Sequence, residues 1–297
     1  MNKYTTGLIY GVSAYVLWGL LPLYWKIVEE AGAYEILAHR GIWSLILCLL
    51  LLTIRKQLKS ALSMVWKRRT ISLLLLASLV LTINWGVYIW SVTVNRVVEA
   101  ALGYYITPLI IIAFGVLLLR EKMRPMQWVA VGIAAIGVTI LTIDYGRLPW
   151  VALSLALSWG TYGLLKKKLD LGALEGLTIE TLISLLPYGF YLFYLGNQGS
   201  GQFGHGTLMT ILLVSAGAMT AIPLLLFNGS TTRLPYSTIG LLQYITPTIQ
   251  FSIGVWINHE DMPTARWLGF VVIWLALVAL GTDLVRSSRT IDNRIAQ

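Results

Sequence analysis

The sequence is poor in charged residues. They make up 12% of its 297 positions, whereas soluble domains carry roughly 25%. Hydrophobic residues make up 57% of the chain. A soluble fold of this length cannot hide so much apolar surface, so the composition excludes a water-soluble globular protein and favours one dissolved in lipid.

The sequence also lacks the residues of several common active sites. Its single cysteine, Cys48, lies in an apolar run, so no disulfide can form within the chain. The histidines His39, His205 and His259 are scattered, and no His/Cys cluster has the spacing of metal ligands. No phosphate-binding glycine loop occurs, and nothing points to a Ser–His–Asp triad. We therefore predict that the protein is not an enzyme and binds no cofactor or metal.

What the chain does contain is a series of apolar runs of about 20 residues, the length that a helix needs to cross a bilayer. Backbone groups cannot stay unpaired in lipid, so these runs must be helices. The first run is longer than the core of a signal peptide and has no cleavage site, so we expect it to be retained. We predict an all-α integral membrane protein with ten transmembrane helices at residues 4–26, 34–54, 71–93, 97–119, 125–145, 148–166, 174–195, 208–228, 235–257 and 264–284.

Lysine and arginine set the expected orientation, because cytoplasmic loops are enriched in them. With a cytoplasmic N-terminus, only Lys26, Arg96, Arg147 and Arg266 fall on the outer side, and Arg40 lies within a span; the rest of the 22 basic residues are cytoplasmic. We predict that both termini are cytoplasmic, in a bacterial inner membrane. Since the basic residues mark topology, the net charge of +9 does not indicate nucleic-acid binding.

The second half of the chain repeats the first. Residues 105–128 and 244–267 are identical at ten of 24 positions, and both segments begin with Tyr-Ile-Thr-Pro. We predict a five-helix repeat at 1–145, a second at 146–285, and a cytoplasmic tail at 286–297. Five is odd, so the second repeat must enter from the opposite side, which gives the inverted-topology architecture of many secondary transporters.

The repeat places Pro108 and Pro247 near the middle of spans four and nine, where we expect them to kink the helices. A proline cannot bond the carbonyl four residues earlier, here that of Tyr104 or Gln243. In lipid such a carbonyl must be satisfied by protein, water or a ligand. The simpler alternative is that the prolines only kink the helices and nearby threonines bond back to the chain. Their occurrence in both halves favours a central site.

Aromatic and amide side chains lie at comparable depth in several spans. We predict that they line a cavity between the repeats, suited to a small amphiphilic or zwitterionic organic substrate. In the alternative interpretation, Asn84 joins two helices. The predicted lining residues are Trp18, Asn84, Trp85, Tyr88, Tyr104, Tyr105, Trp159, Tyr162, Gln243 and Tyr244.

Ionisable residues within spans are costly in lipid, and an uncompensated arginine costs about 3 kcal/mol. Arg40 either forms a structural ion pair, with Glu35 or Glu99 as its partner, or binds a substrate carboxylate. Glu180 in span seven and His39 are candidates for proton coupling.

Loop glutamates and glycines mark the fifth span of each half. Glu121 and Glu260 precede spans five and ten, where we expect them to cap helices or close loops. Gly132 and Gly137 have the spacing of close helix packing.

These motifs resemble the drug/metabolite transporter superfamily, and within it the EamA-type repeat. That repeat has about five spans, a Thr-Pro pair in the fourth, and a loop glutamate followed by glycines in the fifth. The corresponding residues here are Thr107-Pro108, Glu121, Gly132 and Gly137, then Thr246-Pro247 and Glu260, with Val271 and Ala276 in place of the second pair of glycines. Residues 35–44, EILAHRGIWS, are similar to the second span of RarD-type members.

The resemblance covers residues 5–284 and implies a transporter that exports or exchanges a metabolite, amino acid or drug-like solute by alternating access. It implies a cavity lined mainly by spans three, four, eight and nine. One chain in the lipid bilayer is sufficient for this mechanism, although a homodimer is compatible with it. Two alternatives stay open: a membrane enzyme acting on a lipid-linked substrate, and a channel or receptor.

Overall fold

The computed structural model describes residues 3–63, 68–119, 125–169, 172–234, 238–239 and 242–295. These residues are helical with short connections and contain no strand, which confirms the predicted all-α class. The helices are α1 (Lys3–Ile27), η1 (Glu29–Ala31), α2 (Gly32–Ile54), α3 (Leu58–Ser63), α4 (Arg68–Thr93), α5 (Val97–Leu119), α6 (Pro125–Asp144), α7 (Trp150–Leu169), α8 (Ala173–Gln198), α9 (Thr207–Thr231), α11 (Ile245–Ser252), the π-helix η3 (Ile253–Ile257) and α12 (Thr264–Ile295).

Within this described part, 8 helical segments are long and apolar enough to cross a membrane. They correspond to α1, α2, α4, α5, α6, α8, α9 and α12. The predicted span at 148–166 is present as α7, which carries Lys166 and Lys168 near its end and falls outside this set. The predicted span at 235–257 is described from Ile245 to Ile257 as a shorter apolar helix.

Several helices end at residues with positive φ, a conformation that glycine and asparagine adopt at low cost. Gly199 ends α8 with φ of 62°, and its N–H donates to the carbonyls of Gly196 and Leu195. Gly146 follows α6 with φ of 63°, and Asn95 follows α4 with φ of 54°. These turns set the helix ends close to their predicted positions.

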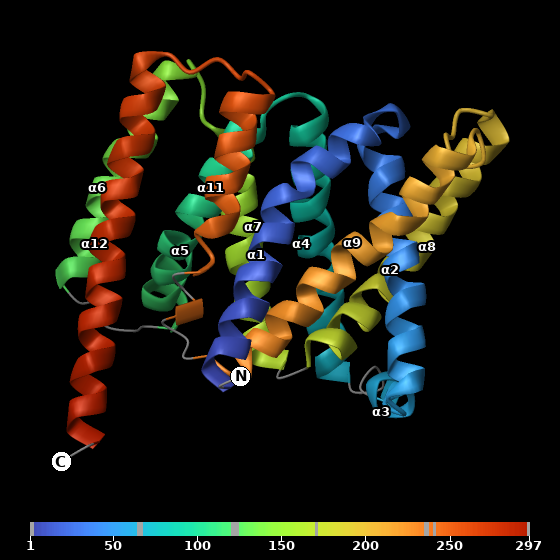
Figure 1. The fold of residues 1–297 in the computed structure, drawn as a ribbon, viewed down its shortest axis with the longest axis horizontal. Coiled ribbons are helices and arrows are strands. Elements are labelled where there is room, and N and C mark those ends of the chain that lie inside the picture. The colour runs from blue at the N-terminus through green and yellow to red at the C-terminus, as the bar shows by residue number, and fades with distance from the viewer. Residues whose placement is uncertain are drawn as a thin grey trace.

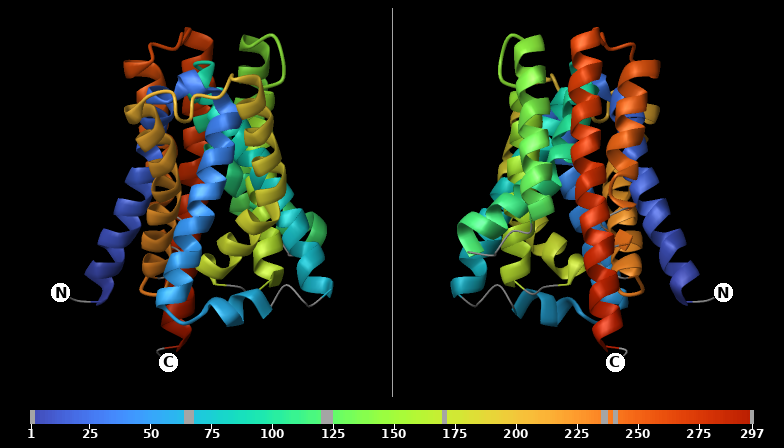
Figure 2. Two further views of the ribbon diagram at one scale, coloured as in Figure 1. Left: turned by 90° about the vertical axis from the view of Figure 1, so that its right-hand side faces the viewer. Right: turned by 90° about the vertical axis from the view of Figure 1, so that its left-hand side faces the viewer.

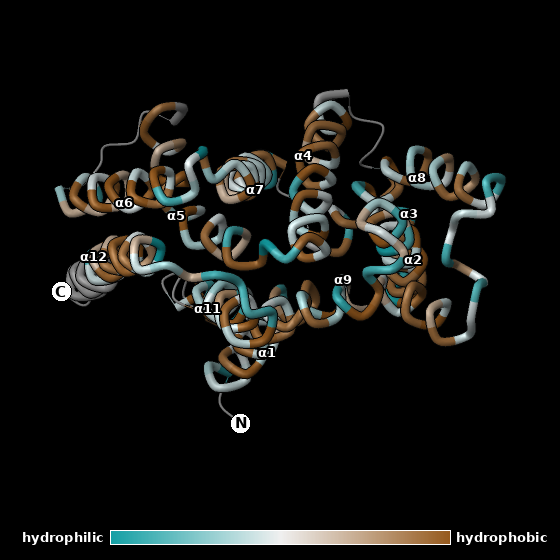
Figure 3. The backbone as a smooth tube through the Cα atoms, turned by 90° about the horizontal axis from the view of Figure 1, so that it is seen from above, coloured by the Kyte–Doolittle hydropathy of each residue, from teal (hydrophilic) through white to brown (hydrophobic). Residues whose placement is uncertain are grey.

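The helices interleave the two halves of the chain. The most extensive helix contacts are α6 with α12, α5 with α7, α2 with α8 and α9, α1 with α9, and α4 with α7. Seen from above, α4, α5, α6 and α7 form one row, and α12, α11, α1 and α9 form a facing row (Figure 3). Each of these contacts joins a helix before residue 145 to one after it, so the interface between the halves runs through the whole bundle.

Glycines allow some of these helices to approach closely. A Cβ on Gly137 of α6 would lie 2.8 Å from Cγ1 of Ile273 and 3.1 Å from the carbonyl oxygen of Gly269, both in α12. This confirms the predicted packing role of Gly137. The same prediction for Gly132 is wrong, because a Cβ there would meet no atom within 4 Å in the part of the chain that the structure describes.

Candidate functional site

Arg40 in α2 is a charged side chain buried in the bundle, with 4% of its surface exposed. Its guanidinium carbon lies 3.0 Å from the ring centroid of Trp85 in α4. Its Nη1 donates to Oγ1 of Thr220 in α9 at 3.4 Å. Its Nε and Nη2 are buried and have no hydrogen-bond partner in the part of the chain that the structure describes. A buried cation with two free donors is the most unusual feature of the interior.

Neither carboxylate that we expected to pair with Arg40 does so. Glu35 instead accepts hydrogen bonds from the backbone N–H groups of Gln202, at 2.9 and 3.1 Å, and Phe203, at 3.0 Å. Glu99 is bound to other groups at the start of α5 and α7. Of the two alternatives for Arg40, the ion pair with Glu35 or Glu99 is therefore wrong, because both acids hold loops and helix ends. Depth along a span does not reveal which side chains are lateral neighbours.

A small cavity lies beside Arg40, between α2, α4 and α8. Its volume is about 10 Å³, which is near the minimum for one water molecule. It is lined by Arg40, Gly41, Ser78, Leu81, Thr82, Trp85, Glu180, Thr181, Ser184 and Tyr188. Hydroxyl groups in this lining bond one another, with Ser78 Oγ 2.8 Å from Ser184 Oγ and Thr82 Oγ1 3.1 Å from Tyr188 Oη. The cavity therefore has hydroxyl groups in its wall and adjoins a buried positive charge.

Glu180 also borders this cavity, with 1% of its surface exposed. Its Oε1 accepts a hydrogen bond from Lys166 Nζ at 3.1 Å, and its Oε2 accepts one from Tyr162 Oη at 3.0 Å. Tyr162 in turn packs against Trp159, with 5.5 Å between ring centroids. Glu180 is thus compensated by a lysine, and its role in proton coupling stays a prediction.

A second polar contact joins α1, α4 and α11 through Gln250. Its Nε2 donates to Tyr88 Oη at 2.9 Å and to the carbonyl oxygen of Trp18 at 3.3 Å, while its buried Oε1 has no partner among the described residues. The ring of Tyr104 packs edge-on against that of Tyr88, with centroids 5.8 Å apart. Gln250 was not among the predicted site residues, because its counterpart in the repeat is the apolar Ile111. The signal in the sequence that could have identified Gln250 is a single amide side chain within an apolar run.

The structure separates the predicted lining residues into groups. Trp18, Trp85, Tyr88 and Tyr104 belong to or pack against one hydrophobic cluster, which also contains Leu37 of α2. Tyr105 and Tyr244 belong to or pack against a different cluster, centred on α5, α11 and α12.

Asn84 joins two helices, as the alternative interpretation of this residue expects. It is 0% exposed, and its Nδ2 donates to Ser158 Oγ at 2.8 Å and to the carbonyl oxygen of Leu155 at 3.1 Å. These contacts hold α4 against α7.

The two prolines occupy different helical positions. Pro108 lies inside α5, whereas Pro247 lies in the first turn of α11, after a turn at residues 243–244. Thr107 bonds back to the carbonyl oxygen of Gly103 at 3.0 Å, as the simpler alternative expects. Thr246 instead donates across to the carbonyl oxygen of Tyr15 in α1, at 2.7 Å.

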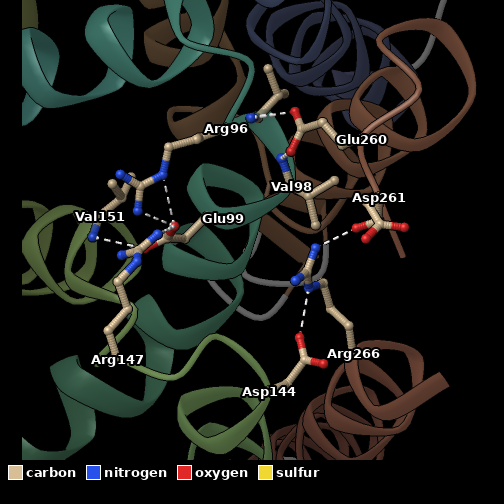
Figure 4. A network of polar contacts seen from close by, with 10 residues as sticks. Arg96, Val98, Glu99, Asp144, Arg147, Val151, Glu260, Asp261 and Arg266 are labelled. Carbon is tan, nitrogen blue, oxygen red and sulfur yellow. Dashed lines mark hydrogen bonds and ion pairs between the residues drawn. The ribbon is translucent and has the colours of Figure 1, made fainter. Parts of the chain in front are cut away.

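Carboxylates hold one end of the bundle together, where the chain enters α5, α7 and α12 (Figure 4). The two oxygens of Glu260 accept the backbone N–H groups of Val97 and Val98, the first residues of α5. Oε1 of Glu99 accepts the N–H of Val151 near the start of α7, at 3.1 Å. Both acids therefore sit at the positive end of a helix dipole. This confirms the predicted capping role of Glu260; Glu121 lies outside the described residues.

Arginines complete this network. Arg96 and Arg147 both bind Oε2 of Glu99, with Arg147 Nη2 at 3.3 Å. Arg266 Nε donates to Oδ2 of Asp144 at 2.9 Å. Burial raises the pKa of Glu260 to about 7, although the N–H groups that it accepts and the charge of Arg266 oppose this rise.

Comparison with known proteins places these features in a wider group. The model of the EamA-like transporter family matches residues 5–143 and 149–282. Protein RarD of Streptomyces exfoliatus is 48% identical over 289 residues, which cover 97% of this chain and 92% of that protein. The uncharacterized transporter YojE of Bacillus subtilis is 43% identical, and the match covers 95% of this chain and 96% of that protein. A solved crystal structure with 16% identity covers 96% of this chain and 100% of its own, with a TM-score of 0.61, and shares the fold alone.

Proposed function

The chain belongs to the EamA-like transporter family, and on that premise we propose that it moves a small organic solute across a bacterial inner membrane by alternating access. As a member, it is a transmembrane transporter of the drug/metabolite type. The transport is secondary, by export or exchange, and the solute is a metabolite, an amino acid or a drug-like molecule.

The proposed architecture is ten transmembrane helices in two inverted repeats, 1–145 and 146–285. In this scheme α7 is the sixth span, and residues 235–257, which include α11 and η3, form the ninth. Two matches of the family model, at 5–143 and 149–282, support two repeats.

The helix contacts also support this symmetry. Exchanging the halves turns α1 into α7, α4 into α9, and α5 into α11. The contacts of α1 with α9 and α11 then become those of α7 with α4 and α5, and all four are present. The contacts of α2 with α8 and of α6 with α12 map onto themselves. A pseudo-two-fold axis of this kind allows one half to rock against the other.

The proposed topology puts both termini in the cytoplasm. The distribution of lysine and arginine supports it. Both ends of the described chain lie at the same end of the bundle, as an even number of spans requires (Figures 1 and 2).

The observation that carries the function is the unpaired guanidinium edge of Arg40 where the two halves meet. Arg40 bonds Thr220 of the other half, and Gln250 of the second half bonds Tyr88 of the first. Buried polar groups without partners are costly, and a ligand that supplies the partners offsets this cost. The residues proposed to contact the solute are Trp18, Arg40, Trp85, Tyr88, Tyr104, Tyr105, Trp159, Tyr162, Gln243, Tyr244 and Gln250.

Counterflow in proteoliposomes tests this proposal. Purified protein is reconstituted with one unlabelled solute of a metabolite panel inside, and uptake of the same labelled solute is followed from outside. A carrier gives transient accumulation above equilibrium, which requires no energy source. Steady ionic current without counterflow would identify a channel instead, and chemical conversion of the solute would identify an enzyme. Protein-free liposomes are the control.

A further inference from the structure

The charge on Arg40 lacks a counter-ion in the described part of the protein. No carboxylate there forms an ion pair with it, since the acids of the interior are engaged elsewhere. Glu180, which borders the same cavity, binds Lys166. Buried charges are ordinarily paired, because an isolated ion loses its hydration without compensation. The cavity beside Arg40 therefore has an uncompensated positive charge at its wall.

The free donors of Arg40 have a defined geometry. One face of the guanidinium is covered by the ring of Trp85, and Nη1 is directed to Thr220. The two atoms without partners, Nε and Nη2, form one edge of the planar group. The N–H bonds on this edge are parallel, and their spacing matches the two oxygens of a carboxylate. A single edge with two parallel donors suits a planar carboxylate better than a tetrahedral phosphate, which usually meets several cationic groups.

The surroundings add hydroxyl groups but no second free cation among the described lining residues. Ser78, Thr82, Ser184 and Tyr188 line the cavity, and each can donate or accept a hydrogen bond. The cavity, at about 10 Å³, is too small for a whole carboxylic acid. Binding therefore requires α2, α4 and α8 to separate, a motion that alternating access would supply.

We propose that the transported solute is an organic carboxylate, bound side-on through its two oxygens to Nε and Nη2 of Arg40 in the cavity between α2, α4 and α8. This inference rests on the proposed transport function and names its substrate class. The ring of Trp85 fixes the plane of the guanidinium, and the hydrogen bond to Thr220 fixes its rotation. The Nε–Nη2 edge is therefore already oriented to bind a carboxylate. A neutral or cationic solute would leave the charge of Arg40 unpaired.

Matched acids and amides test the inference on the full-length protein in detergent. Thermal unfolding is measured with acetate against acetamide, benzoate against benzamide, and pyruvate against pyruvamide, and with sulfate and inorganic phosphate. We expect at least one carboxylate to raise the unfolding temperature in a saturable manner, while its amide does not. Equal effects of acid and amide for every pair would overturn the proposal, as would stabilisation by sulfate and phosphate but by no carboxylate.

Variants locate the binding site. Arg40→Gln should raise the Kd of the binding carboxylate by about tenfold or more, because it removes both charged hydrogen bonds. Thr220→Val keeps the free edge but loses the hydrogen bond that fixes its rotation, so it should raise the Kd by a smaller factor, about threefold. Arg55→Gln, at the exposed C-terminal end of α2, removes a charge outside the cavity and is the matched control. Unchanged affinity in Arg40→Gln would refute the site; if this variant does not fold, Arg40→Lys, which keeps the charge but loses the planar fork, decides in the same way.

The two proposals can fail separately. Carboxylate binding that depends on Arg40, without counterflow of that carboxylate, would retain the site and refute transport. Counterflow of a neutral or cationic solute, without binding of any carboxylate, would retain transport and refute the substrate class.

Discussion

At the scale of single residues, the acids Glu180 and Glu260 have different roles, which depend on the groups that donate hydrogen bonds to them. Glu180 meets a lysine and a tyrosine, whereas Glu260 meets two backbone N–H groups at the start of α5. Glu180 therefore compensates the charge of Lys166 inside the bundle. Glu260 caps the start of α5. Because Glu260 lies outside the membrane-spanning segments, its protonation can follow the pH of the surrounding solution.

Glu260 should make the stability of the protein depend on pH. Its pKa is about 7 in the folded protein and near the ordinary 4.5 when unfolded. Between these values the folded state binds more protons than the unfolded state, so the free energy of unfolding falls as pH rises from 4.5 to 7 and is flat above that. The difference amounts to about 3 kcal/mol at most.

The Glu260→Gln variant isolates this contribution. Unfolding of the wild type and of Glu260→Gln is measured in detergent at intervals from pH 5 to pH 8. The wild type should lose stability relative to the variant as pH rises to about 7. A difference that stays constant across this range would show that Glu260 does not titrate there.

At the scale of helices, close approach between α2 and α9 depends on Gly217. Ser44 Oγ donates to the carbonyl oxygen of Gly217 at 3.3 Å. A Cβ at position 217 would lie 2.6 Å from Cβ of Trp43 and 2.7 Å from the backbone nitrogen of Ser44. Because backbone atoms form part of this contact, the helices must move apart to admit a methyl group.

We therefore expect Gly217→Ala to destabilise the protein by about 2 kcal/mol, the usual size of an overpacking effect. Gly132→Ala is the matched control, since its Cβ would meet no atom of the described residues within 4 Å and alanine favours a helix. Thermal unfolding in detergent compares the two variants with the wild type. Equal stability of both variants would mean that α2 and α9 do not pack as described.

Much at this scale could be predicted from the sequence, because length and hydropathy decide where a helix can cross lipid. The predicted span 97–119 is α5, Val97–Leu119. The neighbours of Arg40 in adjacent helices could not be predicted. Its candidate partners were Glu35 and Glu99, and it instead contacts Trp85 and Thr220. Side-by-side packing of helices far apart in sequence determines such contacts, and neither hydropathy nor repeat symmetry reveals it.

At the scale of the whole molecule, the two halves hold each other at one end of the bundle. Glu260, from the second half, caps α5 of the first, and Glu99 of α5 caps α7 of the second. Arg96 and Arg147 bind the same carboxylate from both halves. Opening the bundle at this end therefore requires these hydrogen bonds to break, so the network holds the two halves together there (Figure 4).

Alternating access requires a cavity that opens to each side of the membrane in turn, and the accessibility of Ser184 tests this directly. Ser184 lines the cavity and is 7% exposed, and the native Cys48 is 0% exposed. A Ser184→Cys variant is treated with a small membrane-impermeant thiosulfonate in right-side-out and in inside-out vesicles, with the wild type as control. We predict that position 184 reacts from both sides and that the wild type reacts from neither. Reaction from one side only, or from neither, would contradict alternating access.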